Sequence, residues 1–468
     1  MVFSSLLFIF VFLPIILSVY YLSPRFLKNF VIFIGSLIFY AWGEPVYIFL
    51  MLFISVFDYI NGMLIEKYRE RKGIARAVLI TSITVDLLIL GFFKYFGFVV
   101  DNISALFDLN VMARELPLPI GISFYTFQSI SYIVDVYRGN VKAQTNYISY
   151  GTFVTMFPQL VAGPIIKYID VSKEINHRKE SITLFGEGVI LFIIGLSKKV
   201  LLANNIGVLW QSVKSTPADE ISVLTAWLGI LAFTFQIYFD FSGYSDMARG
   251  LGKMFGFNFM LNFNYPYISK SITEFWRRWH ISLGTWFREY LYIPLGGNRV
   301  GRLRQYRNLF VVWFLTGFWH GASWNFIVWG LYFGVFITIE KMFLLKWFEK
   351  WPPFIGRCYT LLLVIIGWVF FEYEVLRDGL QFIQIMFGWG TNPFVDADAI
   401  YYLYTNAILF VALIICSTPL LKNMAVKLQE KAKITSGIAV PVLFTLLLFI
   451  CTAYLVNLSY NPFLYFRF

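Results

Sequence analysis

Two histidines in tryptophan- and glycine-rich surroundings are the residues of this chain best suited to chemistry. Of only three histidines, His280 ends the run Glu274-Phe-Trp-Arg-Arg-Trp-His, and His320 follows in Phe318-Trp-His-Gly-Ala-Ser-Trp-Asn325. Imidazole takes up and returns a proton near neutral pH. An ionisable group is costly in hydrocarbon, so one placed there is a candidate functional residue. Apolar surroundings disfavour the charged form, and a neutral imidazole is a base for a hydroxyl group. The alternative for each histidine alone is a packed ring bonded to a carbonyl; the pairing favours chemistry.

Basic residues beside His280 suggest what its site would bind. Arg277, Arg278 and Arg288 flank it, next to Trp276. Guanidinium groups match phosphate oxygens in fork geometry, so a nucleotide-linked thioester such as a coenzyme A ester would fit. The alternative is that the basic residues only set the membrane topology and contact anionic lipids. We favour this alternative for the arginines from Arg299 onward.

Other polar residues of this region are candidates for supporting a chamber. Asp240 and Asp246 lie in Asp-Phe-Ser-Gly-Tyr-Ser-Asp, and Trp324 and Asn325 follow His320. The two aspartates are not at i, i+4 spacing, so a shared proton is not implied and a structural role is equally compatible. His177 lies in a basic loop, where we expect a solvated side chain.

The elements that must position these residues are membrane helices. The chain of 468 residues is 59% hydrophobic and 14% charged, which excludes an ordinary soluble enzyme. The apolar runs predict an all-α polytopic protein with roughly ten to twelve passes. We expect spans at 3–22, 30–43, 45–65, 77–99, 184–203, 221–241, 308–335, 358–372, 400–416 and 435–457, with shorter apolar pieces at 118–135 and 147–166.

The segment from Asp240 to Arg307 mixes aromatics, glycines and charges, and does not resemble a simple span. Such backbone is tolerated at membrane depth only inside protein or along a cavity, so we expect re-entrant or interfacial helices around a chamber. Aromatic residues at three- and four-residue spacing predict one amphipathic helix over 274–290, capped by Ser271 or Thr273.

Charge sets the expected orientation. The net charge of +11 is distributed over short loops, which favours positive-inside topology over nucleic-acid binding. Basic loops at 66–76 and 422–433 are expected in the cytoplasm, with both termini outside. The first 22 residues lack a basic n-region and a cleavage site, so we interpret them as a retained span. The three cysteines lack metal-ligand spacing, and neither a metal site nor a disulfide framework is expected. The chain 1–468 is interpreted as one membrane domain.

The chain resembles a known family along nearly its whole length. The residues from Asp240 to Asn325 resemble the membrane-bound O-acyltransferase family, in its bacterial alginate O-acetyltransferase branch. The matching stretches are Phe241-Ser-Gly-Tyr-Ser-Asp-Met-Ala248, Asn262-Phe-Asn-Tyr-Pro-Tyr267, Glu274-Phe-Trp-Arg-Arg-Trp-His280, Leu291-Tyr-Ile-Pro-Leu-Gly-Gly-Asn-Arg299, Phe157-Pro-Gln-Leu-Val-Ala-Gly-Pro164, Phe39-Tyr-Ala-Trp42 and Met1-Val-Phe-Ser-Ser5.

The resemblance implies a ring of helices around a central channel, with a signature core at about 240–335. It implies that His320 is the catalytic histidine and His280 the second signature position. It further implies a thioester donor on the cytoplasmic side, no bound cofactor, an extracytoplasmic polysaccharide acceptor and a partner of the SGNH esterase-like type.

The last residues resemble an aromatic motif carried by a companion peptide of teichoic-acid D-alanylation. The sequence Phe463-Leu-Tyr-Phe-Arg-Phe468 closes a tail, 458–468, that is expected outside the cell. By this resemblance Tyr465 is a candidate acyl relay. The alternative is an aromatic belt at the membrane interface.

These features predict an enzyme of the bacterial cell membrane that moves acetyl groups from acetyl-CoA toward an exported polysaccharide. The first alternative is D-alanyl transfer to teichoic acid from a carrier-protein thioester. A second, from another class, is a polytopic transporter or export channel. That class leaves the two histidine motifs unexplained, as would a membrane scaffold.

Overall fold

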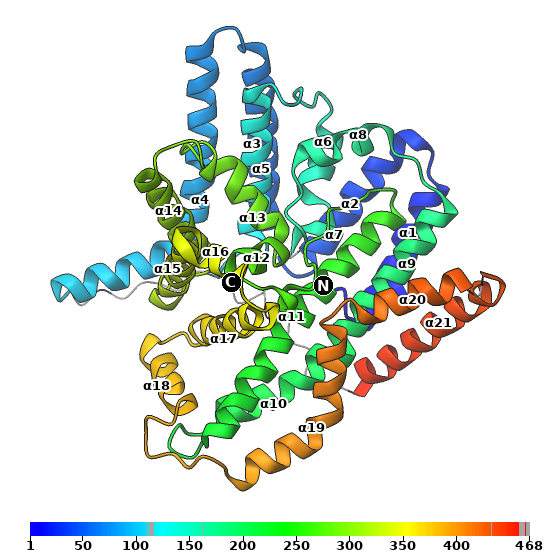
Figure 1. Cartoon of the computed structure of the whole chain (residues 1–468). Coiled ribbons are helices and arrows are strands. Elements are labelled where there is room, and N and C mark those ends of the chain that lie inside the picture. Colours follow the sequence, from blue (N-terminus) through cyan, green and yellow to red (C-terminus); the bar gives the residue numbers. More distant parts are fainter. Residues whose placement is uncertain (110, 112–116, 162, 432, 458–463, 465–468) are drawn as a thin grey trace. The chain divides into compact units, whose positions relative to one another are not determined.

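Helices make up every regular element of the part of the chain that the structure describes. The computed structural model describes residues 1–109, 111, 117–161, 163–431, 433–457 and 464 (Figure 1). Within these ranges, eight helices are long and apolar enough to cross a membrane, and the stretch Phe8–Leu22 is a shorter apolar helix. The chain is therefore an all-α polytopic membrane protein, as predicted. The eight segments are Ile48–Lys67, Lys72–Phe107, Ile182–Ser215, Val223–Met254, Trp324–Phe348, Pro353–Glu372, Ala397–Cys416 and Gly437–Asn457.

The helices fall into two compact units. The first comprises Met1–Phe192 and Ser245–Met260, and the second comprises Ile193–Tyr244 and Leu261–Phe468. Two long helices, α9 (Ile182–Ser197) and α11 (Val223–Met254), pass from one unit into the other.

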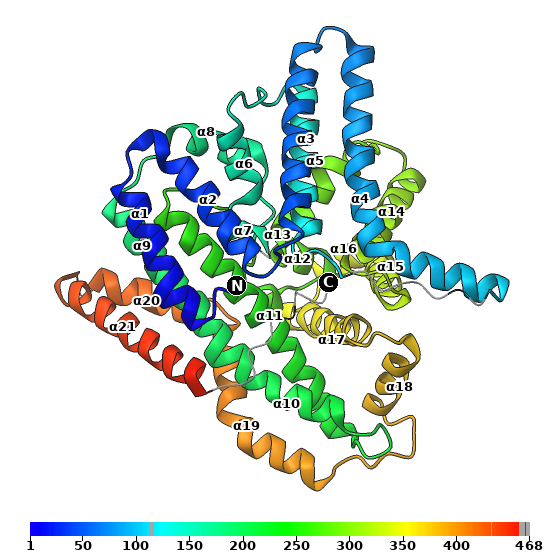
Figure 2. The same cartoon turned by 180° about the vertical axis from the view of Figure 1, so that it is seen from behind.

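The first unit is built around three helices that lie side by side, α3, α4 and α5 (Figures 1 and 2). Gly139, in the left-handed conformation with φ of 76°, ends α5, where a residue with a Cβ would be strained. Asn146 accepts from the backbone N–H of Ser149 at 3.1 Å and so caps α6. The elements are η1 (Phe8–Phe12), α1 (Leu13–Leu22), η2 (Arg25–Leu27), α2 (Lys28–Ala41), α3 (Ile48–Lys67), α4 (Lys72–Phe107), α5 (Ile122–Arg138), α6 (Tyr147–Thr155), α7 (Phe157–Leu160) and α8 (Tyr168–His177).

The second unit holds the histidine motifs. Its elements are η3 (Lys198–Ala203), α10 (Asn204–Ser215), η4 (Pro266–Ile268), α12 (Ile272–Arg278), α13 (Ile281–Phe287), η5 (Arg288–Tyr292), α14 (Arg302–His320), α15 (Trp324–Ile339), η6 (Glu340–Leu344), α16 (Leu345–Phe348), α17 (Pro353–Glu372), α18 (Leu376–Met386), α19 (Ala397–Cys416), α20 (Leu420–Lys431) and α21 (Lys433–Asn457).

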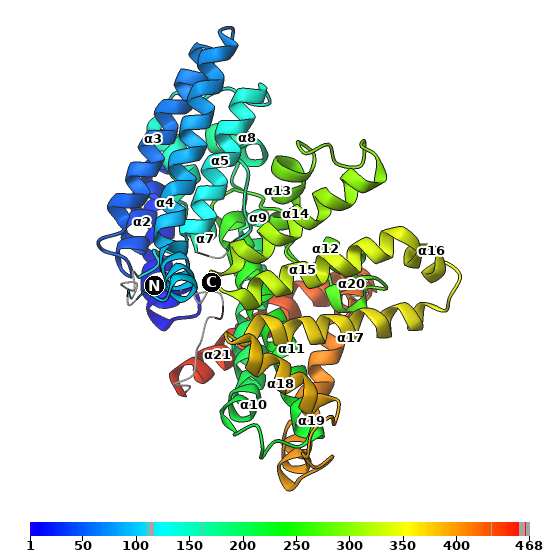
Figure 3. The ribbon, with the colours of Figure 1, turned by 90° about the vertical axis from the view of Figure 1, so that its left-hand side faces the viewer.

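The helices α14 and α15 form a tightly packed hairpin, seen from the side in Figure 3. Glycines allow the close approach: a Cβ at Gly317 would lie 2.2 Å from the carbonyl oxygen of Phe326, and one at Gly330 would lie 2.3 Å from that of Trp313. Any larger residue would push the helices apart. This contact fixes the end of α14, where His320 lies.

Two predictions about helix boundaries are wrong. The expected span 308–335 is two helices, because Gly321 breaks the apolar run and α15 starts again at Trp324. The irregular segment expected from Asp240 onward begins later, because α11 continues to Met254. The first run stays apolar across the real boundary, and in the second case the mixture of aromatics, glycines and charges already begins inside α11. Hydrophobicity alone therefore locates neither boundary.

Candidate active site

His280 lies at a break between two short helices. We predicted one helix over 274–290, but α12 ends at Arg278 and α13 begins at Ile281. His280 has a φ of 44°, in the left-handed region that non-glycine residues seldom adopt. The side chain of Asn262 stabilises the break: its Oδ1 accepts from Ser282 N at 3.1 Å, from Ser282 Oγ at 2.9 Å and lies 3.3 Å from His280 Nδ1. Strained backbone held by such contacts is common at functional sites.

The His280 ring is held neutral and in one orientation. The residue is 2% exposed, and Phe241 contacts the ring edge-on at a centroid distance of 4.8 Å. Because Asn262 Oδ1 is an acceptor, we assign the proton to Nδ1, which leaves the lone pair on Nε2. Burial lowers the pKa of His280 to about 3. The imidazole is therefore a neutral hydrogen-bonding group throughout the physiological range.

This lowered pKa predicts acid sensitivity. The unfolded chain binds a proton at His280 below about pH 6.5, whereas the folded chain does so only near pH 3, so stability falls as pH drops through this window. At pH 4.5 the cost is roughly 2–3 kcal/mol. We expect His280→Gln to lose less stability than the wild-type protein between pH 7 and pH 4.5. Melting temperatures of both proteins in detergent at the two pH values measure this. Parallel losses would show that His280 does not carry the effect.

His320 is the last residue of α14 and is also buried, at 4% exposure. Trp329 and Phe371 contact its ring edge-on, at centroid distances of 4.9 and 5.3 Å. Trp319 links the two histidines: its ring lies 5.0 Å from His320 and 6.3 Å from His280. Aromatic rings on these sides limit the motion of the imidazole and its access to water.

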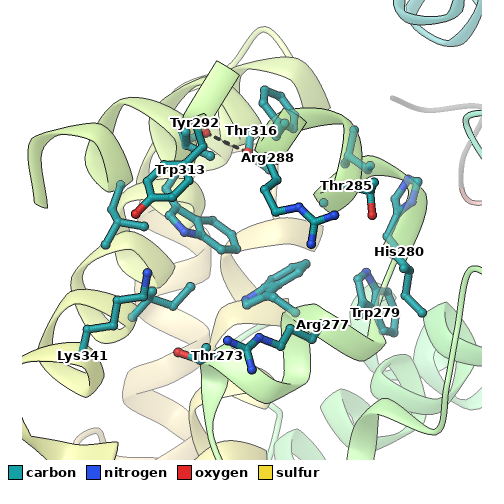
Figure 4. Close-up of a pocket in the computed structure, with 18 of the residues that line it drawn as sticks. Thr273, Arg277, Trp279, His280, Thr285, Arg288, Tyr292, Trp313, Thr316 and Lys341 are labelled. Carbon is teal, nitrogen blue, oxygen red and sulfur yellow. Dashed lines mark hydrogen bonds between the residues drawn. The ribbon is translucent and has the colours of Figure 1, made fainter. Parts of the chain in front are cut away.

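Both histidines line one pocket of about 540 Å³. This volume is typical of small-ligand sites. Figure 4 shows Arg277, Arg288 and Lys341 extending toward the same space from three elements, with His280 at its edge. Trp276 also lines the pocket, and its buried Nε1 has no hydrogen-bond partner among the described residues. Apolar walls with three cations and a few donors suit an anionic ligand that has an apolar arm. Other lining residues include Thr273, Thr285, Tyr292, Asn298, Trp313 and Thr316.

Several predicted site residues lie outside this pocket. Arg278 turns away and pairs with Glu274 at 2.9 Å. Trp324 is 57% exposed, and the Asn325 amide donates to the carbonyl of Phe370 at 3.1 Å, which joins α15 to α17. In the first unit, Asp246 pairs with Arg249 on the next turn of α11 at 3.1 Å. These contacts are structural.

Asp240 connects three segments of the second unit. It pairs with Lys199 of η3 at 2.5 Å, with both side chains 3% exposed. Its other oxygen accepts from the backbone N–H of Leu464 at 2.9 Å. A buried ion pair needs such additional hydrogen bonds to offset its desolvation. Asp240 thus anchors one residue of the C-terminal tail, while Tyr465 itself lies outside the described residues.

Sequence analysis missed three residues that shape the pocket: Asn262, Glu340 and Lys341. Asn262 lies in the quoted stretch Asn262-Phe-Asn-Tyr-Pro-Tyr267, but its contact with His280 bridges eighteen positions. Glu340 and Lys341 are adjacent charges within the largely apolar segment Trp324–Phe348. Charges inside a span were the available signal.

Glu340 positions the helix that brings Trp276 and Arg277 to the pocket. This buried carboxylate accepts from the backbone N–H groups of Ile272 and Thr273 at 2.6 and 2.8 Å, and from the Thr273 hydroxyl at 2.6 Å. Ser271 completes the start of α12 by accepting from Glu274 N at 3.0 Å, as one of the two predicted caps. The first turn of α12 therefore depends on an acceptor from α15 and η6.

Removing that acceptor should destabilise the protein. Glu340→Ala leaves one buried and two partly buried donors without this acceptor, and we expect a loss of roughly 3–5 kcal/mol. Glu340→Gln keeps one carbonyl acceptor and should cost less. Thermal unfolding in detergent measures both. Glu349→Ala, at an exposed acid nearby, is the matched control and should be neutral. Equal melting temperatures for Glu340→Ala and the control would refute the positioning role.

Comparison with known proteins agrees with this site. The profile of the MBOAT, membrane-bound O-acyltransferase family matches residues 141–372, which include both histidines. The chain is 46% identical over 401 residues to a probable alginate O-acetylase of Pseudomonas aeruginosa, covering 84% of this chain and 76% of the relative. It is 35% identical over 424 residues to a peptidoglycan O-acetyltransferase of Helicobacter pylori, covering 83% and 80%.

A teichoic acid D-alanyltransferase of Bacillus subtilis is 30% identical over 264 residues, covering 54% of this chain and 66% of the relative. The similarity to the two O-acetylating relatives thus extends over more of this chain than the similarity to the D-alanylating one. The chain belongs to the alginate O-acetylase-like branch of the membrane-bound O-acyltransferase family, and it is a multi-pass O-acyltransferase of a bacterial cell membrane.

Proposed function

We propose that the protein takes an acetyl group from acetyl-CoA on the cytoplasmic side and passes it toward hydroxyl groups of an extracytoplasmic polysaccharide. The observation that carries this proposal is the shared pocket, in which two buried histidines meet Arg277, Arg288 and Lys341. The cations suit the phosphates of the donor, and the apolar walls suit its pantetheine arm. The chain is similar to a probable alginate O-acetylase and to a peptidoglycan O-acetyltransferase. These relatives support acetyl as the transferred group and a polysaccharide as the acceptor.

His320 acts as the general base in this proposal. Its neutral imidazole accepts the proton of the acceptor hydroxyl as that oxygen forms a bond to the thioester carbonyl carbon. The C–S bond then breaks, and the imidazolium returns the proton to the departing thiolate, so the histidine is regenerated. His280 is uncharged and held in place by Asn262. In this proposal it helps to position the donor or forms part of the proton path.

The transferred group must then leave on the far side. Coenzyme A is too large and too charged to cross hydrocarbon, whereas an acetyl ester is small and neutral. We propose Tyr465 as the acceptor that carries it outward to an SGNH-type partner. The anchoring of Leu464, the preceding residue, to Asp240 supports a role for this tail. A phenol has an ordinary pKa of about 10, so Tyr465 needs a base such as His320 before it can attack. If Tyr465→Phe retains full polymer acetylation, the relay is wrong.

D-alanyl transfer to teichoic acid is the second candidate. It is favoured by the 30% identity to a teichoic acid D-alanyltransferase, which covers about half of this chain. That reaction would take its donor from a carrier protein, so the pocket cations would bind a carrier-linked phosphate rather than a nucleotide.

Ester analysis of cells separates the candidates. A strain that lacks the gene is compared with the same strain after the gene is restored. Acetate released by base from the exported polysaccharide and D-alanine released by base from the wall are measured in both. Our proposal predicts that acetate esters are lost on deletion while D-alanine is unchanged. Loss of D-alanine alone would favour the second candidate. Unchanged esters with reduced polymer export would instead support a transporter.

A further inference from the structure

Another charged pocket lies in the first unit and shares no lining residue with the histidine pocket. It measures about 600 Å³ and is formed by the loop between α1 and α2, the start of α6 and the end of α8. Four permanent cations line it against one carboxylate, that of Glu180. The cations are Arg25, Lys28, Arg178 and Lys179. Such an excess at one concave site favours an anion.

Arg178 gives this pocket the character of a built site. Its side chain is 6% exposed, and its guanidinium group is fixed by hydrogen bonds to Tyr20 OH at 2.7 Å and to Asn29 Oδ1 at 2.5 Å. Phe257 packs against the guanidinium plane, with Cζ 4.8 Å from the ring centroid. The remaining nitrogen, Nη2, is buried without a hydrogen-bond partner among the described residues. A fixed guanidinium with one unused donor edge is suited to a phosphate oxygen.

The carboxylate of Glu180 does not cancel this charge. Glu180 accepts from Tyr20 OH at 2.7 Å and from Lys28 at 2.9 Å, and it lies 3.8 Å from Arg178. Burial alone would raise the pKa of Glu180, but the hydrogen bonds from Tyr20 and Lys28 hold it below its ordinary value. The ionised carboxylate therefore orders the cations, while Arg25 and Lys179 remain exposed at the rim.

The surroundings of the pocket are apolar and exposed. Phe26, which lines it, is 81% exposed. Leu22 and Ile182, close to it in sequence, are 86% and 93% exposed. Exposed apolar side chains beside a cationic site are typical of a membrane surface. There, lipid acyl chains cover the apolar side chains and anionic headgroups contact the cations. Because the N-terminus is expected outside and the first 22 residues are interpreted as a span, the α1–α2 loop that follows is expected on the cytoplasmic side, where anionic lipids are enriched.

We propose that this pocket binds the phosphate of an anionic glycerophospholipid, with its acyl chains lying over Leu22, Phe26 and Ile182. The lipid would tie the α1–α2 loop to α6 and α8 at the membrane surface. This inference is independent of the acyl-transfer site, because none of its residues lines the histidine pocket.

Lipid binding to the purified full-length protein tests the proposal. Native mass spectrometry in detergent counts phosphatidylglycerol and phosphatidylcholine retained from an equal mixture, and titration gives the affinity for phosphatidylglycerol. We expect selective retention of phosphatidylglycerol. Arg25→Gln with Lys179→Gln should bind it roughly thirtyfold more weakly, since each basic residue contributes near an anionic surface. Arg178→Gln should remove the selectivity for phosphatidylglycerol if this variant folds. If it does not fold, the variant with Arg25→Gln and Lys179→Gln, both at exposed positions, still tests the proposal.

Matched controls exclude a general charge effect. Arg71→Gln with Lys72→Gln removes the same charge from exposed positions at the start of α4 and should bind as the wild-type protein does. Arg25→Lys with Lys179→Arg keeps the charge and should also bind normally. Equal weakening by the two neutralising pairs, or no selectivity over phosphatidylcholine, would overturn the proposal. Displacement of the lipid by inorganic phosphate at equal concentration would show a free-phosphate site instead.

Discussion

Replacing His320 by alanine is expected to reduce acyl transfer by roughly 10²–10⁴-fold, the range for loss of a general base. Among the described residues that line the pocket, we see no equivalent base: burial lowers the pKa of His280 to about 3, and Arg277, Arg288 and Lys341 are cations. The loss should appear in kcat, because the base acts in the transition state. Rates of thiol release and of acetyl-ester formation, measured on purified protein or native membranes, give the effect.

The folded state must be checked beside the rate. His320→Ala removes a buried ring that packs on Trp329 and Phe371, so its melting temperature and detergent elution profile are compared with the wild-type protein. His320→Gln fills more of the space without supplying a base and should be equally inactive. Trp324→Phe, in the same motif but 57% exposed, is the control and should remain active. Near-normal turnover by a folded His320→Ala protein would remove His320 from the mechanism.

Neutralising both pocket arginines is expected to raise the KM for acetyl-CoA about a hundredfold with little change in kcat. Arg277 and Arg288 line the pocket, and each charged hydrogen bond to a phosphate contributes about tenfold once solvent screening is included. The phosphates are remote from the reacting carbonyl, so they bind equally in the ground and transition states. Steady-state kinetics of Arg277→Gln with Arg288→Gln measures the split between KM and kcat.

Arg278 provides the matched control for this variant. It is adjacent to Arg277 in sequence but pairs with Glu274 outside the pocket, so Arg278→Gln should leave the KM unchanged. A comparable rise in KM for Arg278→Gln would mean that the effect is general to the basic surface. A fall in kcat with constant KM in the double variant would place the arginines at the reacting group instead of the donor phosphates.

The sequence was sufficient to predict the all-helical membrane class and four of the residues that line the pocket. His280, His320, Arg277 and Arg288 are ionisable groups in aromatic surroundings, and such groups are retained in membranes where they bind or react. The resemblance to the O-acyltransferases rested on several sequence motifs, one of which contains Arg277 and His280, and the comparisons confirm the family.

The local geometry could not be predicted from the same pattern. The aromatic periodicity of 274–290 continues through the break at His280, and that break depends on Asn262, a tertiary contact. The apolar run 308–335 hides the turn at Gly321 because both flanking helices are apolar. Arg278 differs from Arg277 only by rotation about the helix axis, which decides which of them reaches the pocket. Periodicity describes faces, whereas these outcomes depend on neighbours distant in sequence.

Transfer across a sealed membrane tests the central claim most directly. Inside-out vesicles from cells that make the polymer expose the cytoplasmic face and retain any partner, and radiolabelled acetyl-CoA is added outside. Our account predicts base-labile label on polysaccharide in the vesicle lumen, with wild-type protein but not with His320→Ala. It also predicts no such label in right-side-out vesicles, which the donor cannot enter. Equal labelling in wild-type and His320→Ala inside-out vesicles would contradict it. Labelling of polysaccharide by acetyl-CoA added to right-side-out vesicles would also contradict it.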